Sequence, residues 1–113
     1  MNHISYTREV AEAFDFTTTE IFQWELEAIH RALLGKKVII TVHARRAAQA
    51  DKVALVELLE AVLVGVPVSK DLPDNDLQRV PGINYEHRIS DNRWIRVKVA
   101  WIDRYAVITV YKI

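Results

Sequence analysis

The last third of the chain contains three runs of strand-forming residues that only short turns separate. The runs span residues 83–89, 93–101 and 105–113, and they are connected by Ser90-Asp91-Asn92 and Ile102-Asp103-Arg104. Connections this short join antiparallel neighbours, because a parallel return needs a crossover of about a dozen residues or more. This part of the sequence therefore predicts an antiparallel meander, and the rest of the chain must fold against it.

The middle run alternates in character along its length. One set of alternate positions is apolar and consists of Ile95, Val97, Val99 and Trp101. The intervening set consists of Trp94, Arg96, Lys98 and Ala100. Successive side chains of a strand point to opposite faces of the sheet. We therefore expect one face to pack on helices and the other to be cationic and aromatic.

Helical patterns dominate the sequence before the meander. A short helical turn is expected over residues 7–14, and a longer amphipathic helix over residues 19–34, which Gly35 ends. The β-branched run at residues 37–42 predicts a short strand. Further elements are expected in chain order as helices at 43–49 and 51–64, an edge strand at 66–69 and a loop at 71–82.

Together these elements predict a single α+β domain over residues 1–113. We expect N-terminal helices to pack on one face of a three- to five-stranded antiparallel sheet. Within this domain, residues 1–35 form an acidic helical extension and residues 37–113 form the core.

The composition excludes several kinds of chemistry. The chain has no cysteine, which rules out disulfides, thiolate metal sites and cysteine nucleophiles. Its histidines and acids show no metal-ligand spacing, and its three glycines form no phosphate-binding loop. We therefore expect no metal and no cofactor. The opening residues do not resemble a signal peptide and no apolar run is long enough to span a membrane, so a cytoplasmic location is expected.

The net charge of zero hides a division along the chain. Residues 1–34 carry six acids and two bases, whereas residues 35–113 carry nine acids and thirteen bases. Such asymmetry suggests that the main body meets an anion, and that Glu20, Glu25 and Glu27 lie across it as a cover. One alternative is that both segments simply present solvated charged surfaces. Another, equally simple, is that the acidic helix packs through its apolar stripe to complete the core.

Two short motifs resemble those of a known family. The first is Ile39-Ile40-Thr41-Val42-His43-Ala44-Arg45-Arg46, and the second is Val107-Ile108-Thr109-Val110-Tyr111. A strand that leads into a His-Ala-x-x-Arg helix, with such a closing strand, resembles the bacterial RelE/BrnT-like toxin superfamily, and in particular an uncharacterised branch of it. The resemblance covers residues 37–113. It departs at Gln49-Ala50-Asp51-Lys52, where the family usually has another Arg or a Gly-Ile-Ser turn.

This resemblance implies a barnase/RelE type of fold and metal-independent cleavage of RNA, in a system where a cognate antitoxin is the partner. Such cleavage needs a group that deprotonates the 2′-hydroxyl, cations that stabilise the phosphate, and a proton for the leaving oxygen. The candidate catalytic residues are His43, His87, Arg96, Lys98 and Tyr111. The candidate nucleic-acid-binding residues are Arg45, Arg46, Arg88 and Trp94. His87 and Arg88 should point to opposite faces, so only one of them can join the cationic face.

The sequence is compatible with three interpretations of function. The chain is a toxin-like ribonuclease or its inactive descendant, a non-catalytic nucleic-acid-binding module, or an interaction protein. In the last case Phe22, Trp24 and the acidic helix would dock on a partner or on a second copy of the chain. Each candidate residue also has an ordinary structural role open to it, such as helix capping, cross-strand pairing or partial burial.

Overall fold

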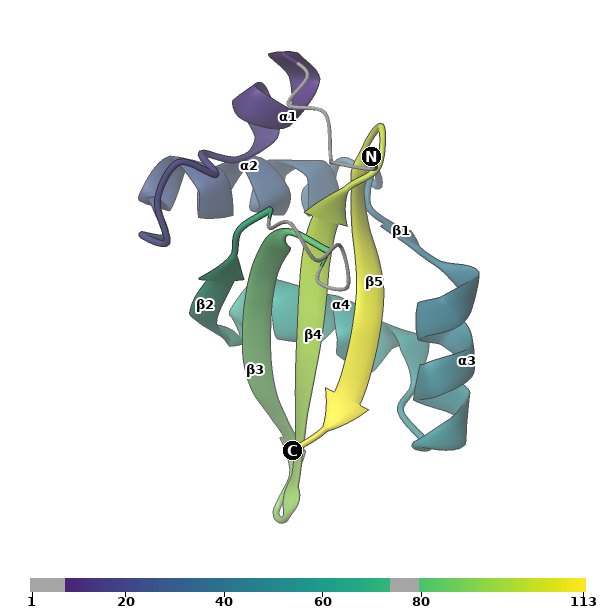
Figure 1. Ribbon diagram of the computed structural model, residues 1–113. Helices are drawn as coiled ribbons and strands as arrows, with labels where there is room; N and C mark the ends of the chain where they lie inside the picture. The colour runs from purple at the N-terminus through teal and green to yellow at the C-terminus, as the bar shows by residue number, and fades with distance from the viewer. Residues whose placement is uncertain (1–7, 74–79) are drawn as a thin grey trace.

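The computed structural model describes residues 8–73 and 80–113 and confirms the predicted α+β class. Four helices and five strands lie within these described residues (Figure 1). In chain order they are α1 (Arg8–Ala13), α2 (Gln23–Leu34), β1 (Ile39–Ile40), α3 (Val42–Ala50), α4 (Leu55–Val64), β2 (Val66–Asp71), β3 (Gly82–Ser90), β4 (Arg93–Trp101) and β5 (Tyr105–Lys112).

The strands form one sheet in the order β1-β5-β4-β3-β2. Strands β2 to β5 pair antiparallel, so the predicted meander is confirmed. Strand β1 pairs parallel with β5, however, with Ile39 opposite Ala106 and Ile40 opposite Val107. The prediction of an antiparallel sheet was therefore wrong for this strand. Residues 41–104 separate β1 from β5, so no short turn dictates their relative direction.

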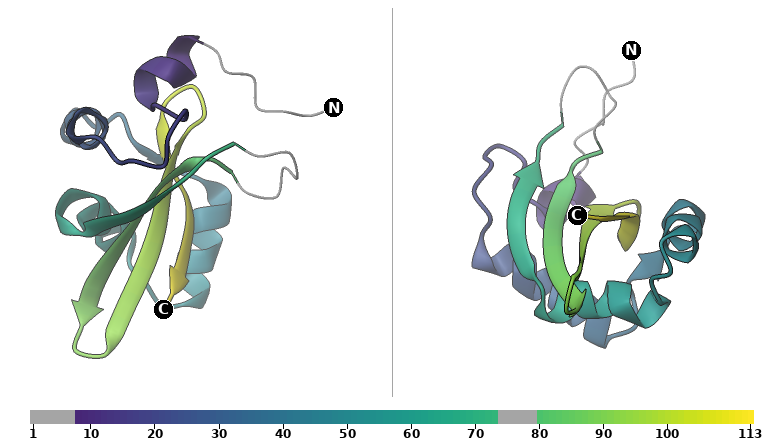
Figure 2. Two further views of the ribbon diagram at one scale, coloured as in Figure 1. Left: turned by 60° about the vertical axis from the view of Figure 1, so that its left-hand side comes forward. Right: turned by 90° about the horizontal axis from the view of Figure 1, so that it is seen from below.

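Helices α2 and α4 cover one face of the sheet (Figures 1 and 2). Helix α4 crosses behind β3 and β4, α2 lies alongside α4, and α3 lies against β5 (Figures 1 and 2). Ile95, Val97 and Val99 of β4 are fully buried on this side, as the alternation predicted. They join a core to which every helix contributes buried residues, namely Ala13, Ile29, Ala44, Ala48, Leu58, Ala61 and Val62. We call the opposite side of the sheet the open face; it is turned toward the viewer in Figure 1.

Two helices begin later than their sequence patterns predict. Helix α2 ends at Leu34 before Gly35, as expected, but begins at Gln23. The preceding threonines form local turns instead, since Thr17 donates to the Asp15 carboxylate and Thr18 Oγ1 accepts from the Glu20 amide. The Thr17 bonds hold the pKa of Asp15 below its ordinary value. Helix α4 begins at Leu55 because Lys52 takes a left-handed φ of 57°, which interrupts the helix.

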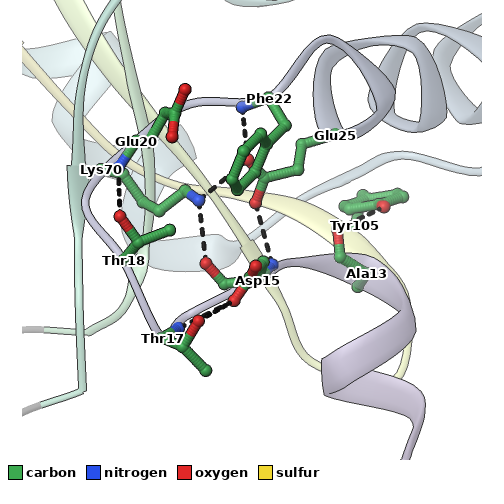
Figure 3. A network of polar contacts seen from close by, with 9 residues as sticks. All are labelled: Ala13, Asp15, Thr17, Thr18, Glu20, Phe22, Glu25, Lys70 and Tyr105. Carbon is green, nitrogen blue, oxygen red and sulfur yellow. Dashed lines mark hydrogen bonds and ion pairs between the residues drawn. The ribbon is translucent and has the colours of Figure 1, made fainter.

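A buried ion pair fastens α2 and the segment before it to the sheet (Figure 3). Lys70 Nζ of β2 lies 2.8 Å from Glu25 Oε1 of α2, and both side chains are fully buried. Lys70 also donates to the Asp15 carbonyl at 2.9 Å. Glu25 in turn accepts from the amides of Asp15 at 3.0 Å and Phe22 at 2.8 Å. These bonds compensate the charges that burial removes from water.

The acidic helix does not cover the open face, so that prediction was wrong. Lys70 lies opposite Ile83 in the register and therefore points to the helix-covered side, where it engages Glu25. Glu20 and Glu27 are exposed to solvent. His30 of α2 is partly buried, and its Nε2 lies 3.0 Å from the Val62 carbonyl of α4.

We predict that Lys70→Met strongly destabilises the protein, because it leaves the Glu25 carboxylate buried without its counter-ion. Removing one member of a buried ion pair costs about 3–5 kcal/mol in the free energy of unfolding, which urea denaturation measures. Lys112→Met is the matched control. Lys112 Nζ lies 3.9 Å from Asp51 Oδ1 with its side chain 61% exposed, and exposed pairs contribute at most about 1 kcal/mol. Equal losses in the two variants would contradict this account.

Candidate nucleic-acid interface

The strand register gathers the chemically active side chains of three strands on the open face. In β3 and β4, Glu86 lies opposite Arg96, Arg88 opposite Trp94, and Asn84 opposite Lys98. In β4 and β5, Arg96 lies opposite Tyr111 and Lys98 opposite Thr109. Directly opposed residues of antiparallel strands point to the same face. The predicted face with Trp94, Arg96 and Lys98 on it is therefore present, and Arg88 and Tyr111 join it.

Arg96 is the centre of a hydrogen-bonded unit on this face. Its Nε donates to Glu86 Oε2 at 2.9 Å, and its Nη2 donates to the same oxygen. Its Nη1 donates to the Tyr111 hydroxyl at 3.1 Å, with the guanidinium carbon 5.8 Å from the centroid of the Tyr111 ring. The hydrogen bonds that Arg96 donates to Glu86, and to a lesser extent to Tyr111, raise the pKa of Arg96. The outer edge of the guanidinium still carries N–H groups that can donate hydrogen bonds to a phosphate.

Lys98 is held more tightly than Arg96. Its Nζ lies 2.6 Å from Asp71 Oδ2 and donates to the Val80 carbonyl at 2.9 Å. Asn84 donates to the same Asp71 oxygen at 2.9 Å and to Ser69 Oγ at 3.0 Å. The Lys98 side chain is only 12% exposed. Its charge is therefore neutralised close by, and it contributes less to a ligand site than the sequence suggested.

The other end of the open face carries exposed aromatic and cationic groups. Trp94 and Tyr111 are each 43% exposed. Arg88 donates to Asp91 at 3.1 Å in the turn between β3 and β4, and both of these side chains are largely in solvent. An exposed pair of this kind is weak, so the guanidinium of Arg88 is free to exchange partners at low cost.

The structure does not bring the two candidate histidines to this face. His87 lies opposite Ile95 on the helix-covered side, and its Nε2 is 3.9 Å from Glu60 Oε2 of α4. His43 lies exposed in the first turn of α3, with Arg45 and Arg46. Arg45 Nε donates to the Ile40 carbonyl at 3.2 Å. No described hydrogen bond or ion pair links these α3 residues to the open face.

Glu86 is the functional candidate that sequence reasoning missed. The signal was present, because pairing outward from the turn at residues 90–92 places Glu86 opposite Arg96. Glu86 is partly buried and Oε2 takes both bonds from Arg96. Among the described residues Oε1 accepts no hydrogen bond, so this oxygen can take a proton from a ligand.

A second polar cluster has a buried ion pair at its centre. It surrounds the Glu25–Lys70 pair, where the Tyr105 hydroxyl donates to the Ala13 carbonyl at 3.0 Å (Figure 3). The buried Tyr85 hydroxyl has no hydrogen-bond partner among the described residues. Burial raises the pKa of both phenols, with the Glu25 charge adding to the effect, and brings that of Tyr105 to about 12. Since both ends of the ion pair are fully buried, we assign this cluster to stability.

The shifted pKa of Tyr105 predicts a loss of stability at alkaline pH. The unfolded phenol ionises near pH 10, whereas the folded one stays neutral up to about pH 12, so the folded state loses stability across that window. Tyr105→Phe should cost about 1 kcal/mol at pH 7 by removing the hydrogen bond to Ala13. That deficit should shrink or reverse between pH 10 and 12 in urea denaturation. A deficit that stays constant with pH would contradict the shift.

Within residues 8–73 and 80–113, no three histidine or acidic side chains are placed to hold a metal ion. None of the helices in these ranges is both long and apolar enough to cross a membrane. Comparison with known proteins gave no match to this chain among family models, curated proteins or solved structures.

Proposed function

We propose that this chain is a toxin-like, metal-independent ribonuclease whose site is the open face of its sheet. The observation that carries the proposal is the unit of Glu86, Arg96 and Tyr111, which places a proton acceptor, a cation and a hydroxyl donor in contact on an accessible surface. The resemblance of residues 37–113 to the RelE/BrnT-like toxin superfamily supports the same activity and a separate antitoxin as partner.

The three side chains divide the work of RNA transesterification. Glu86 accepts the proton of the 2′-hydroxyl, whose oxygen then attacks the adjacent phosphorus. Arg96 binds the phosphate oxygens with its outer edge and stabilises the charge that builds on them. Tyr111 donates its hydroxyl proton to the 5′-oxygen as the bond from that oxygen to phosphorus breaks. The products are a 2′,3′-cyclic phosphate and a free 5′-hydroxyl.

This assignment places the base at Glu86 and leaves His43 and His87 outside the reaction. A carboxylate is a suitable base here because its partner Arg96 is also the group that receives the phosphate. A phosphate on Arg96 therefore brings the 2′-hydroxyl toward the carboxylate. Lys98 takes no direct part in the reaction; it pairs with Asp71, which also accepts a hydrogen bond from Asn84.

Glu86→Gln should abolish most of the cleavage of mixed RNA in EDTA, because the amide cannot accept the 2′-hydroxyl proton. General-base catalysis contributes about 10²–10⁴-fold, so a loss of at least about 100-fold in rate is expected. His43→Ala and His87→Ala are the controls and should cleave at the wild-type rate. Full activity in Glu86→Gln, or its loss in His43→Ala, would contradict the assignment.

A specific observation favours non-catalytic nucleic-acid binding as the second candidate. Trp94 and Tyr111 are each 43% exposed on the open face, and aromatic rings beside a guanidinium bind bases and phosphates without any chemical step. No histidine of the described residues lies on this face. RNA that binds to wild-type protein and remains intact in EDTA would select this function over the ribonuclease.

A further inference from the structure

Two exposed aromatic residues are neighbours of Arg96 on the open face. Tyr111 lies directly opposite Arg96. Trp94 precedes Arg96 on the same face of β4, and its carbonyl accepts a hydrogen bond from the Ile113 amide at 3.1 Å. Trp94 and Tyr111 are therefore diagonal neighbours across β4 and β5, a separation of about 7–8 Å that large aromatic side chains can span.

The Trp94 and Tyr111 rings are not packed into the core of the protein. Tyr85 and Tyr105 on the other side of the sheet are buried, as large aromatics in a small core usually are. Trp94 and Tyr111 remain 43% exposed, and the one described ring contact they make is that of Arg96 over Tyr111. Each ring thus presents surface to solvent next to a guanidinium.

We propose that Trp94 and Tyr111 form a stacking platform for two consecutive unpaired bases, which makes single-stranded RNA the substrate class of the site. This inference rests on the proposed function and extends it. Aromatic side chains stack unpaired bases at about 1–3 kcal/mol per base, whatever the base. The phosphate between the two bases meets the outer edge of Arg96, and Arg88 opposite Trp94 meets the next phosphate along.

Duplex RNA does not fit this arrangement. Its bases are already stacked on one another, and the deep, narrow major groove of A-form RNA keeps their edges from side chains. Bases that stay stacked in a duplex cannot stack on the Trp94 and Tyr111 rings, so stacking adds no binding free energy for duplex RNA. The site therefore discriminates by strandedness more than by sequence.

Trp94→Leu tests the platform, with Trp24→Leu as a matched control. Trp24 is 42% exposed, but it lies on α2, where its ring stacks at 6.5 Å on that of Phe22. The probe is fluorescein-labelled 2′-O-methyl decauridylate, which lacks the 2′-hydroxyl and so cannot be cleaved, and its Kd is measured by fluorescence polarisation. A stacking loss of 1–3 kcal/mol predicts that Trp94→Leu binds about 5–150-fold more weakly. Trp94→Phe should keep most of the affinity, and Trp24→Leu should bind as wild type does.

Three outcomes separate the platform from the ribonuclease. If Trp94→Leu binds decauridylate as tightly as wild type, or wild type binds a 2′-O-methyl duplex equally well, the platform is overturned even where Glu86→Gln abolishes cleavage. If Trp94→Leu alone weakens binding but wild-type protein leaves RNA intact, the platform stands and the ribonuclease fails. An oligomer of the same length without bases should bind wild-type and Trp94→Leu protein equally, since neither can then gain from stacking.

Discussion

The buried ion pair between Glu25 and Lys70 ties α2 and the segment before it to the side of the sheet on which the core lies. Removing two charges from water is costly, so such a pair is retained only where further hydrogen bonds satisfy it. Asp15 and Phe22 supply these bonds from the segment that precedes α2. Because Lys70 points to the helix-covered side, the pair holds the acidic segment against β2 on that side. Within the described residues, this segment therefore does not lie across the opposite face of β3, β4 and β5.

Local patterns in the sequence predicted much of this fold, whereas contacts between distant residues could not be read from it. Alternation along β4 and the short turns fixed the meander and the sides of Ile95 and Arg96 correctly, since both depend on neighbours in sequence. Glu25 looked like any other acid of an amphipathic helix, because its partner Lys70 comes from a different element. The parallel pairing of β1 with β5 was missed for the same reason.

The candidate site was predicted in part, and the missing part is its electrostatics. Alternation placed Trp94, Arg96 and Lys98 together, but it could not show that Glu86 and Asp71 neutralise the two cations. The open face therefore carries paired opposite charges, with a carboxylate beside each of the central cations Arg96 and Lys98. This arrangement suits proton transfer better than non-specific attraction to phosphate. The histidines suggested by residue chemistry alone lie elsewhere, which is why the proposed base is a carboxylate.

The central claim is that RNA binds on the open face, and an NMR titration of ¹⁵N-labelled full-length protein with 2′-O-methyl decauridylate tests it most directly. The side-chain N–H signals of Trp94 and Arg96 report on the open face, and those of Trp24, Arg45 and Arg46 report on helices α2 and α3 in the same experiment. We expect the Trp94 Nε1–H and Arg96 Nε–H signals to shift together and to saturate at the same RNA concentration, while the Trp24 Nε1–H signal stays in place. Shifts confined to Arg45 and Arg46 of α3, with Trp94 and Arg96 unmoved, would contradict it.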